Sequence, residues 1–184
     1  MSTRASVYAK SGTKVKELAE SVGFVPVCWV ALLSPADVEV AATEGSVTVD
    51  RKAAVERCAA AVPFLADLFP DVAFEPHAAE FLALLRRNRA PELVVELNDH
   101  FARDPEFYPV ALRAVVGSIG RRDAACTFDR PPSTFRGFNG TEFKQPAIKL
   151  RTTRDVLGYA AAIPGEEDDD EDLTREKVAG SPLP

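Results

Sequence analysis

The sequence predicts an α+β protein in which helices outnumber strands. Two apolar stripes recur at helical spacing, Val55-Cys58-Val62-Leu65-Phe69 and Tyr108-Leu112-Val115-Ile119. Segments with strand-like patterns lie near both ends of the chain. Strands and helices do not alternate regularly, so a doubly wound parallel sheet is not expected. We predict one helix-rich domain over residues 1–165, with a small sheet formed by the N-terminal and C-terminal strands.

The N-terminal part of the chain is expected to hold strands and helices in turn. Arg4–Ala9 alternates polar and apolar residues and predicts a short strand, whereas the apolar positions of Lys14–Val22 fit one face of a helix. Phe24–Leu33 is rich in β-branched and aromatic residues, which predicts a buried central strand. Ser34-Pro35 is typical of a helix start, and we expect that helix to end near residue 42, before a small strand at Ser46–Val49.

The middle of the chain is predicted to be helical. Asp50 is expected to cap the longest helix, which Pro63 should kink or restart because proline has no amide hydrogen to donate. Pro76, Pro91 and Pro109 each stand at the start of a further predicted helix. These helices are expected over about 77–88, over about 92–103 and from 109 to near 120.

After residue 120 the helical period is lost. Asn139-Gly140 between alternating segments predicts a β-hairpin, and a two-residue turn there would pair Arg136 with Phe143. Ala147–Arg151 predicts a strand, and Thr153 is expected to cap a last helix that ends near residue 162. Residues 166–184 hold eight acids and two bases, so we expect a disordered acidic tail.

The charge of the chain is unevenly distributed. The net charge of −6 belongs to the tail, and residues 1–165 are neutral overall, which excludes a strongly basic domain built to neutralise phosphates. Within this neutral part, residues 37–80 hold nine acids and three bases, whereas residues 113–155 hold nine bases and four acids. These two blocks either steer partners of complementary charge or face one another within the molecule, and the sequence leaves both interpretations open.

Cysteine usage and hydropathy indicate a soluble cytoplasmic protein with no membrane partner. The three cysteines form no short-spaced pair and are odd in number, which does not suit a disulfide framework. The longest apolar run, Phe24–Leu33, is too short to span a bilayer, and no secretory signal precedes it. An apolar setting should raise the pKa of the Cys28 thiol, so Cys126, beside Arg121 and Arg122, is the least unfavourable nucleophile.

The leading functional hypothesis is a non-enzymatic protein that recognises another protein, in the manner of an immunity protein or an antitoxin. It rests on size, charge and the lack of a cofactor or catalytic motif, so no cofactor is expected. The oligomeric state stays open. The proposed contact surface comprises the acids of the predicted helix over 92–103 and its end: Glu92, Glu96, Asp99 and Asp104.

A second hypothesis is nucleic-acid binding by the basic block, with the acidic tail as an internal competitor. Phenylalanines interleaved with bases suit stacking of nucleotides beside a positive groove, although they also suit the core face of a hairpin. The candidate residues are Arg121, Arg122, Arg136, Phe138, Phe143 and Lys144.

A third hypothesis is a metal-dependent enzyme centred on the two histidines. If the helices over 77–88 and 92–103 formed an antiparallel pair, carboxylate and imidazole groups would meet on facing sides. A solvated acidic face explains the same spacing, so the sequence assigns no metal. The residues of this weak candidate are His77, Glu80, Glu96 and His100.

Overall fold

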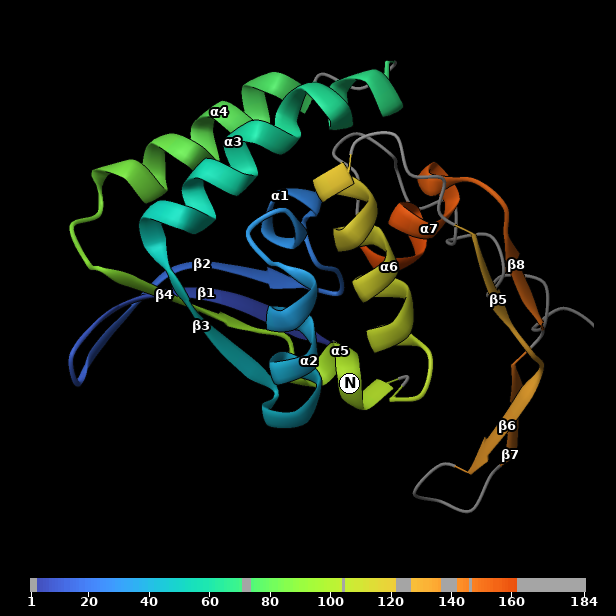
Figure 1. Cartoon of the computed structure of the whole chain (residues 1–184). Helices are drawn as coiled ribbons and strands as arrows, with labels where there is room; N and C mark the ends of the chain where they lie inside the picture. The colour runs from blue at the N-terminus through green and yellow to red at the C-terminus, as the bar shows by residue number, and fades with distance from the viewer. Residues whose placement is uncertain are drawn as a thin grey trace, which may run out of the picture.

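A four-stranded antiparallel sheet lies beneath a pair of long helices (Figure 1). The structure is a computed structural model that describes residues 3–70, 74–103, 105–121, 127–136, 142–145 and 147–161. The strand order is β2-β1-β4-β3, with β1 at Arg4–Ser11, β2 at Lys14–Val22, β3 at Ser46–Asp50 and β4 at Glu92–Glu96. The predicted α+β class is confirmed.

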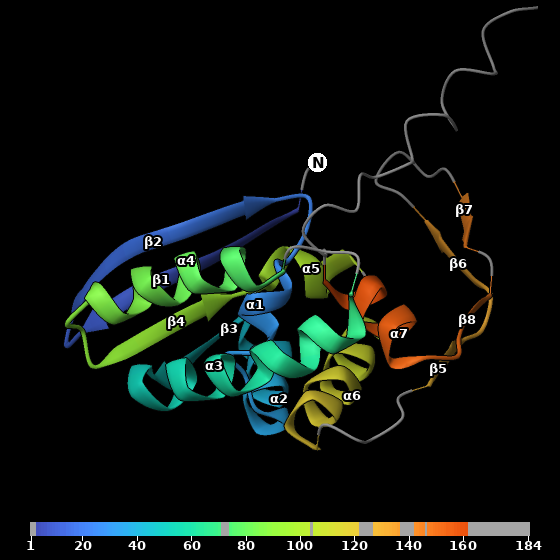
Figure 2. The ribbon, with the colours of Figure 1, turned by 90° about the horizontal axis from the view of Figure 1, so that it is seen from above.

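The helices cover one face of this sheet and continue beyond its end (Figure 2). They are α1 Val27–Val30, α2 Pro35–Glu44, α3 Arg51–Leu68, α4 Phe74–Arg87, α5 Asn98–Arg103, α6 Tyr108–Arg121 and α7 Thr153–Ala160. Four of the five predicted stripe residues of α3 are buried, and the fifth, Val62, packs against the core. Every member of the stripe on α6 is buried.

The central strands β1 and β4 bury alternate side chains against the helices. Val7 pairs with Val95 across them, and both side chains are 0% exposed. Successive residues of a strand point to opposite faces, so the polar residues between these valines lie on the other side of the sheet. This alternation leaves one apolar face beneath the helices and one polar face.

The prediction of a helix over Lys14–Val22 is wrong, because this segment is strand β2, paired antiparallel with β1. The register shifts between Val7 and Tyr8, where Leu18 is the additional residue of a β-bulge. The bulge breaks the two-residue period, and the apolar positions on either side of it imitate the spacing of a helix face.

The prediction of a central strand over Phe24–Leu33 is also wrong, although the segment is buried as expected from Val25 onward. It forms the one-turn helix α1 and the turns beside it, and Val25 to Leu33 is almost wholly buried apart from Pro26. A short apolar run that is covered on all sides has no periodicity to separate strand from helix.

The helix predicted over 92–103 is replaced by strand β4 and the short helix α5. Leu93, Val95 and Leu97 alternate along the strand and are each 0% exposed. β4 lies between β1 and β3 and pairs with both. Its pairing with two strands outweighs the helix-start preference of Pro91 and the four-residue spacing of Glu92 and Glu96.

The ends of the helices follow local capping chemistry. Ser34 and Asp37 form a reciprocal capping box at the start of α2, and Asp50 caps α3 through the amide of Ala53. The helix α3 continues through Pro63 and does not restart there. Thr152, one residue before the predicted cap, caps α7 through the amide of Asp155.

The C-terminal strands do not join the main sheet, which corrects the predicted sheet composition. β5 Phe128–Arg130 pairs with β8 Ile148–Leu150, and β6 Ser133–Arg136 pairs with β7 Glu142–Gln145. Together they form an antiparallel ribbon that extends away from the helices (Figures 1 and 2). The acidic tail lies outside the described residues.

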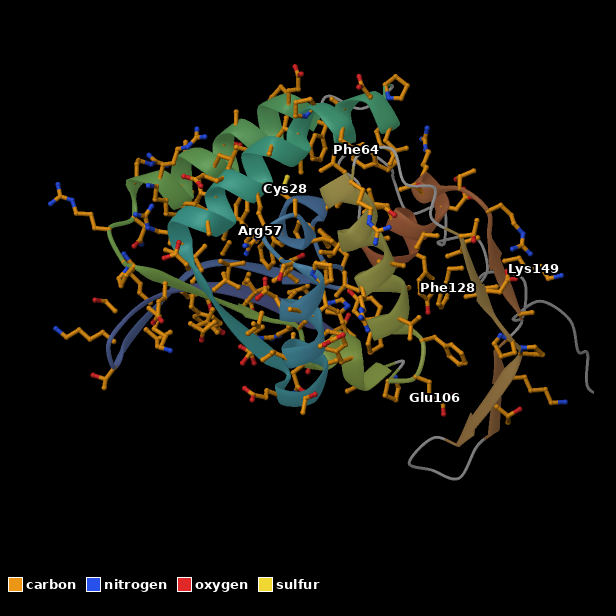
Figure 3. All side chains as sticks on the ribbon, viewed as in Figure 1. Cys28, Arg57, Phe64, Glu106, Phe128 and Lys149 are labelled. Atoms are coloured by element: carbon orange, nitrogen blue, oxygen red, sulfur yellow. The ribbon has the colours of Figure 1, made fainter. Side chains whose placement is uncertain are left out.

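Aromatic packing attaches the base of this ribbon to the helices. Phe128 is 7% exposed, and its ring stacks on Tyr159 of α7 at a centroid distance of 5.7 Å and meets Phe107 edge-on at 6.5 Å. Figure 3 shows Phe128 on the side of the ribbon that faces α6 and α7, with Lys149 on the outer side. The Phe128 ring therefore anchors the base of the ribbon to the helices.

Gly45, which ends α2, gives a test of the packing between the sheet and α5. Its φ is +78°, and an added Cβ would lie 2.8 Å from Oδ1 of Asn98. We expect Gly45→Ala to lower the free energy of unfolding by about 1–3 kcal/mol, because both the backbone strain and the contact are unfavourable. Urea denaturation followed by circular dichroism measures this change.

Gly117→Ala in α6 is the matched control for this substitution. An added Cβ there meets no atom within 4 Å. Alanine should stabilise that helix by roughly 0.5–1 kcal/mol, because it loses less backbone entropy on folding than glycine. Equal effects of the two substitutions would contradict the strain assigned to Gly45.

Candidate recognition surface on the sheet

The face of the sheet that points away from the helices is polar and partly exposed. We call it the open face and define it by the β1 side chains Arg4, Ser6, Tyr8 and Lys10 and by the residues paired with them. On β2 these partners are Val22, Glu20, Glu17 and Val15, and on β4 they are Glu96, Val94 and Glu92. Antiparallel sheets commonly leave one face to solvent in this way.

A pocket of about 270 Å³ lies on this face, near the start of α5. Four carboxylates and one guanidinium line it together with hydroxyl and amide groups, so its net charge is negative. The lining residues are Arg4, Ser6, Tyr8, Glu17, Glu20, Glu96, Asn98 and Asp99. Three strands and one helix therefore contribute to a single acidic depression.

The sheet register places these carboxylates around the Ser6 and Tyr8 side chains. Ser6 lies between Glu20 on one neighbouring strand and Glu96 on the other. Tyr8 is opposite Glu17. The antiparallel pairing of β1 with both neighbours therefore builds the site from residues that are distant in sequence.

Tyr8 stays protonated over a wider pH range than an ordinary tyrosine. The largest single effect, a hydrogen bond with the Ser6 side chain, lowers the pKa of Tyr8. Burial, the hydrogen bond and charge of Glu96, and the charge of Glu17 outweigh it, so the pKa of Tyr8 is raised. A neutral phenol ring beside several carboxylates suits a cationic side chain, which gains from both the charge and the ring face.

Among the described residues, two partly exposed ion pairs engage two of the four acids on the open face. Arg4 contacts Glu20 at 3.1 Å, and Lys10 contacts Glu92 at 3.6 Å. The main-chain amide of Arg4 also donates to the Asp99 carboxylate at 3.1 Å. Exposed pairs of this kind contribute little to stability, so a basic partner can compete for these carboxylates at low cost.

Three of the four acids predicted to contact a partner lie at this face, although not on one helix. Glu92 and Glu96 are on β4, and Asp99 is in the first turn of α5. Asp104 lies outside the described residues. These charges come from one strand and the start of the helix that follows it, and the predicted helical face does not exist.

The structure does not assemble the histidine-centred metal set. His77 and Glu80 are exposed on α4, whereas His100 is 7% exposed on α5 and its ring stacks on Tyr108 at 5.9 Å. Because Glu96 belongs to a strand, the antiparallel helix pair that would have joined these groups is absent. Within the described ranges, no three histidine, cysteine, aspartate or glutamate residues are grouped to hold a metal ion.

The predicted nucleic-acid residues lie on α6 and on the ribbon. Arg121 is exposed at the end of α6, and Lys144 is exposed on β7. Arg136 pairs with Glu142, and Phe143 pairs with Phe135, so the predicted pairing of Arg136 with Phe143 is wrong. Arg122 and Phe138 lie outside the described residues.

Sequence reasoning missed the residues that β1 and β2 bring to the pocket. The alternation of Arg4, Ser6 and Tyr8 was a usable signal, because it places all three on one face of a strand. Glu17 and Glu20 carried no such signal. They share a face only because Leu18 is the additional residue of the bulge.

Comparisons with known proteins identify no relative of this chain. No family model matches the chain, and neither a curated protein nor a solved structure does. Among the helices that the structure describes, none combines the length and the apolar character that a membrane crossing requires. The functional argument therefore rests on the geometry of the open face.

The two described cysteines are unsuited to nucleophilic chemistry. Cys28 and Cys58 are 6% and 1% exposed, and the Cys58 thiol donates to the Cys28 carbonyl at 3.5 Å. Burial raises the pKa of Cys28 to about 11, and burial with the charge of Cys28 raises that of Cys58 to about 12. Figure 3 shows Cys28 within the body, beneath α3.

These pKa values predict slow alkylation of the folded protein. At about pH 8 an ordinary thiol is partly ionised, whereas Cys28 and Cys58 should resist iodoacetamide until denaturant is added. Because their pKa values are raised on folding, the associated stability is complete below the unfolded thiol pKa and is lost as the pH rises through the folded values. Peptide mapping by mass spectrometry measures the modification, and rapid labelling of either native thiol would contradict the assigned burial.

Proposed function

We propose that the protein acts in the cytoplasm by protein–protein recognition, and that its open face binds a basic surface of the partner. The supporting observation is the pocket around Tyr8, in which four carboxylates meet one guanidinium. Charge complementarity of this kind steers association and selects among partners. Blocking of a partner, as immunity proteins and antitoxins do, is one form that this recognition takes.

Catalysis is the weaker interpretation of the same surface. The pocket offers carboxylates, a phenol and a serine hydroxyl, but the Ser6 hydroxyl has no histidine base among the pocket residues. Recognition requires only the charge and shape that these residues supply.

Photo-crosslinking at two equally exposed valines tests the proposed face. Val15 lies on the open face and is 56% exposed, whereas Val110 lies on α6 and is 55% exposed. With a photo-crosslinking amino acid at each position in turn, we expect a discrete protein adduct in cells from position 15 and none of the same mass from position 110. Mass spectrometry identifies the adduct.

Charge reversal tests whether formation of that adduct depends on the acids of the open face. Glu17→Lys with Glu20→Lys should reduce the yield about tenfold or more, as the loss of two close charge pairs implies. Glu56→Lys with Glu75→Lys, at exposed positions on α3 and α4, makes the same change in net charge and should leave the yield intact. Equal adducts from both valines, or equal effects of the two charge reversals, would refute recognition by this face.

Nucleic-acid binding by the ribbon is a second candidate, supported by its extension from the body. Between residues 128 and 151 the sequence holds five bases and two acids. Lys144 and Lys149 are exposed there, and Lys149 points outward (Figure 3). A narrow, basic two-stranded ribbon has the dimensions that a major groove admits.

Filter binding to labelled DNA and RNA, single-stranded and duplex, tests this second candidate. We expect Lys144→Glu with Lys149→Glu to weaken binding and removal of residues 166–184 to strengthen it, with both effects larger at low salt. Lys52→Glu with Arg87→Glu, exposed on α3 and α4, is the charge-matched control. Undetectable binding by every variant would end the nucleic-acid hypothesis.

A further inference from the structure

β2 is the outermost strand of the sheet on the side of the acidic pocket. It is nine residues long, and within the described part of the chain it pairs only with β1. Its second edge therefore carries a row of main-chain N–H and C=O groups that no other strand uses. The opposite edge strand, β3, has five residues and ends at the cap of α3.

β2 presents two exposed lysines, Lys14 and Lys16, on the face toward the helices and a different set of side chains on the open face. Val15 and Val22 are 56% and 50% exposed and lie on the open face, at the two ends of the strand. Glu17 and Glu20 lie between them on the same face. On the open face of this edge, an added strand would meet an apolar residue, two acids and a second apolar residue in turn.

Pairing of β2 with the β2 strand of a second copy conflicts with this order of side chains. The antiparallel twofold register that aligns nearly the full length of the two strands, with the open faces together, places Val15 opposite Val22 and Glu17 opposite Glu20 of the other copy. Like charges directly opposite one another in a sheet are destabilising, and the symmetry would repeat the conflict. The charge pattern therefore favours a different chain.

We propose that β2 binds an extended segment of the partner protein as a fifth strand of the sheet. The segment presents Lys or Arg residues to Glu17 and Glu20, and apolar residues to Val15 and Val22. Strand addition of this kind takes its affinity from main-chain hydrogen bonds and its specificity from alternate side chains. The inference rests on the proposed function, since it names the part of the open face that the partner first contacts.

The bulge in β2 sets the spacing of the recognised residues. Glu17 and Glu20 are three residues apart, yet their partners Tyr8 and Ser6 on β1 are two apart. An added strand that follows the path of β1 therefore places its two basic residues at alternate positions. The recognised pattern is apolar, basic, basic and apolar at every second residue.

A capped synthetic peptide with the order valine-threonine-arginine-threonine-arginine-threonine-valine is the probe for this site. Isothermal titration calorimetry with the full-length protein measures its affinity. We expect binding that is lost when both arginines are replaced by glutamate, and that is weakened by Glu17→Lys with Glu20→Lys. The control pair Glu56→Lys with Glu75→Lys should bind the peptide as the unmodified protein does.

Backbone methylation separates strand addition from simple charge attraction. In a strand, the amides of alternate residues point to opposite edges, so methylation of one alternate set blocks the bonds to β2 and methylation of the other does not. We expect one methylated peptide to lose about tenfold or more in affinity, because several main-chain hydrogen bonds are removed, and the other to retain it. Amide hydrogen exchange should show new protection within β2 and none within β3.

The outcomes distinguish failure of this inference from failure of the proposed function. Equal binding of the two methylated peptides without new protection in β2 would overturn strand addition, even where charge reversal still weakens binding and supports the open face. Absence of binding by the unmethylated peptide would also overturn strand addition. The crosslinking at Val15 tests recognition by the open face independently of the peptide. A stable dimer whose β2 amides are protected without peptide would assign the edge to a second copy and overturn the proposal.

Discussion

The pairing of β1 with β4 is the constraint on which the rest of the fold depends. The two strands come from positions almost ninety residues apart and place Val7 directly opposite Val95. Their inward side chains form the floor of the core under α3 and α4, while their outward side chains bring Tyr8 beside Glu96. The same register therefore determines both the packing of the helices and the position of the acidic pocket.

The sequence predicted those elements whose signals are local. Capping residues such as Ser34 and Asp50 correctly predicted helix starts, because their hydrogen bonds reach only a few residues along the chain. The apolar stripes of α3 and α6 were equally informative, since the buried face of an amphipathic helix is visible in its own sequence as apolar residues at helical spacing. The α+β class followed from the same signals, and the start of the long helix α3 was predicted correctly from its cap, Asp50.

The failures occurred where the structure depends on distant partners. β4 was predicted as a helix because Pro91 and the glutamate spacing are local signals, whereas its two neighbouring strands are not visible in its own sequence. β2 was misassigned because Leu18 changes the side-chain phase within the strand. The candidate site was consequently found only in part, through Glu92, Glu96 and Asp99, without the residues that β1 and β2 add to it.

The long separation between β1 and β4 also determines the order in which the protein can assemble. The β1–β2 hairpin closes through a short turn at Gly12 and is complete once Val22 has been synthesised. The other edge of β1 stays unpaired until β4 has been synthesised, because no closer segment among the described strands pairs with it. Loop closure over such a distance is slow. Until then that edge of β1 carries unpaired main-chain N–H and C=O groups. The nascent chain is therefore prone to aggregation or to binding by a chaperone.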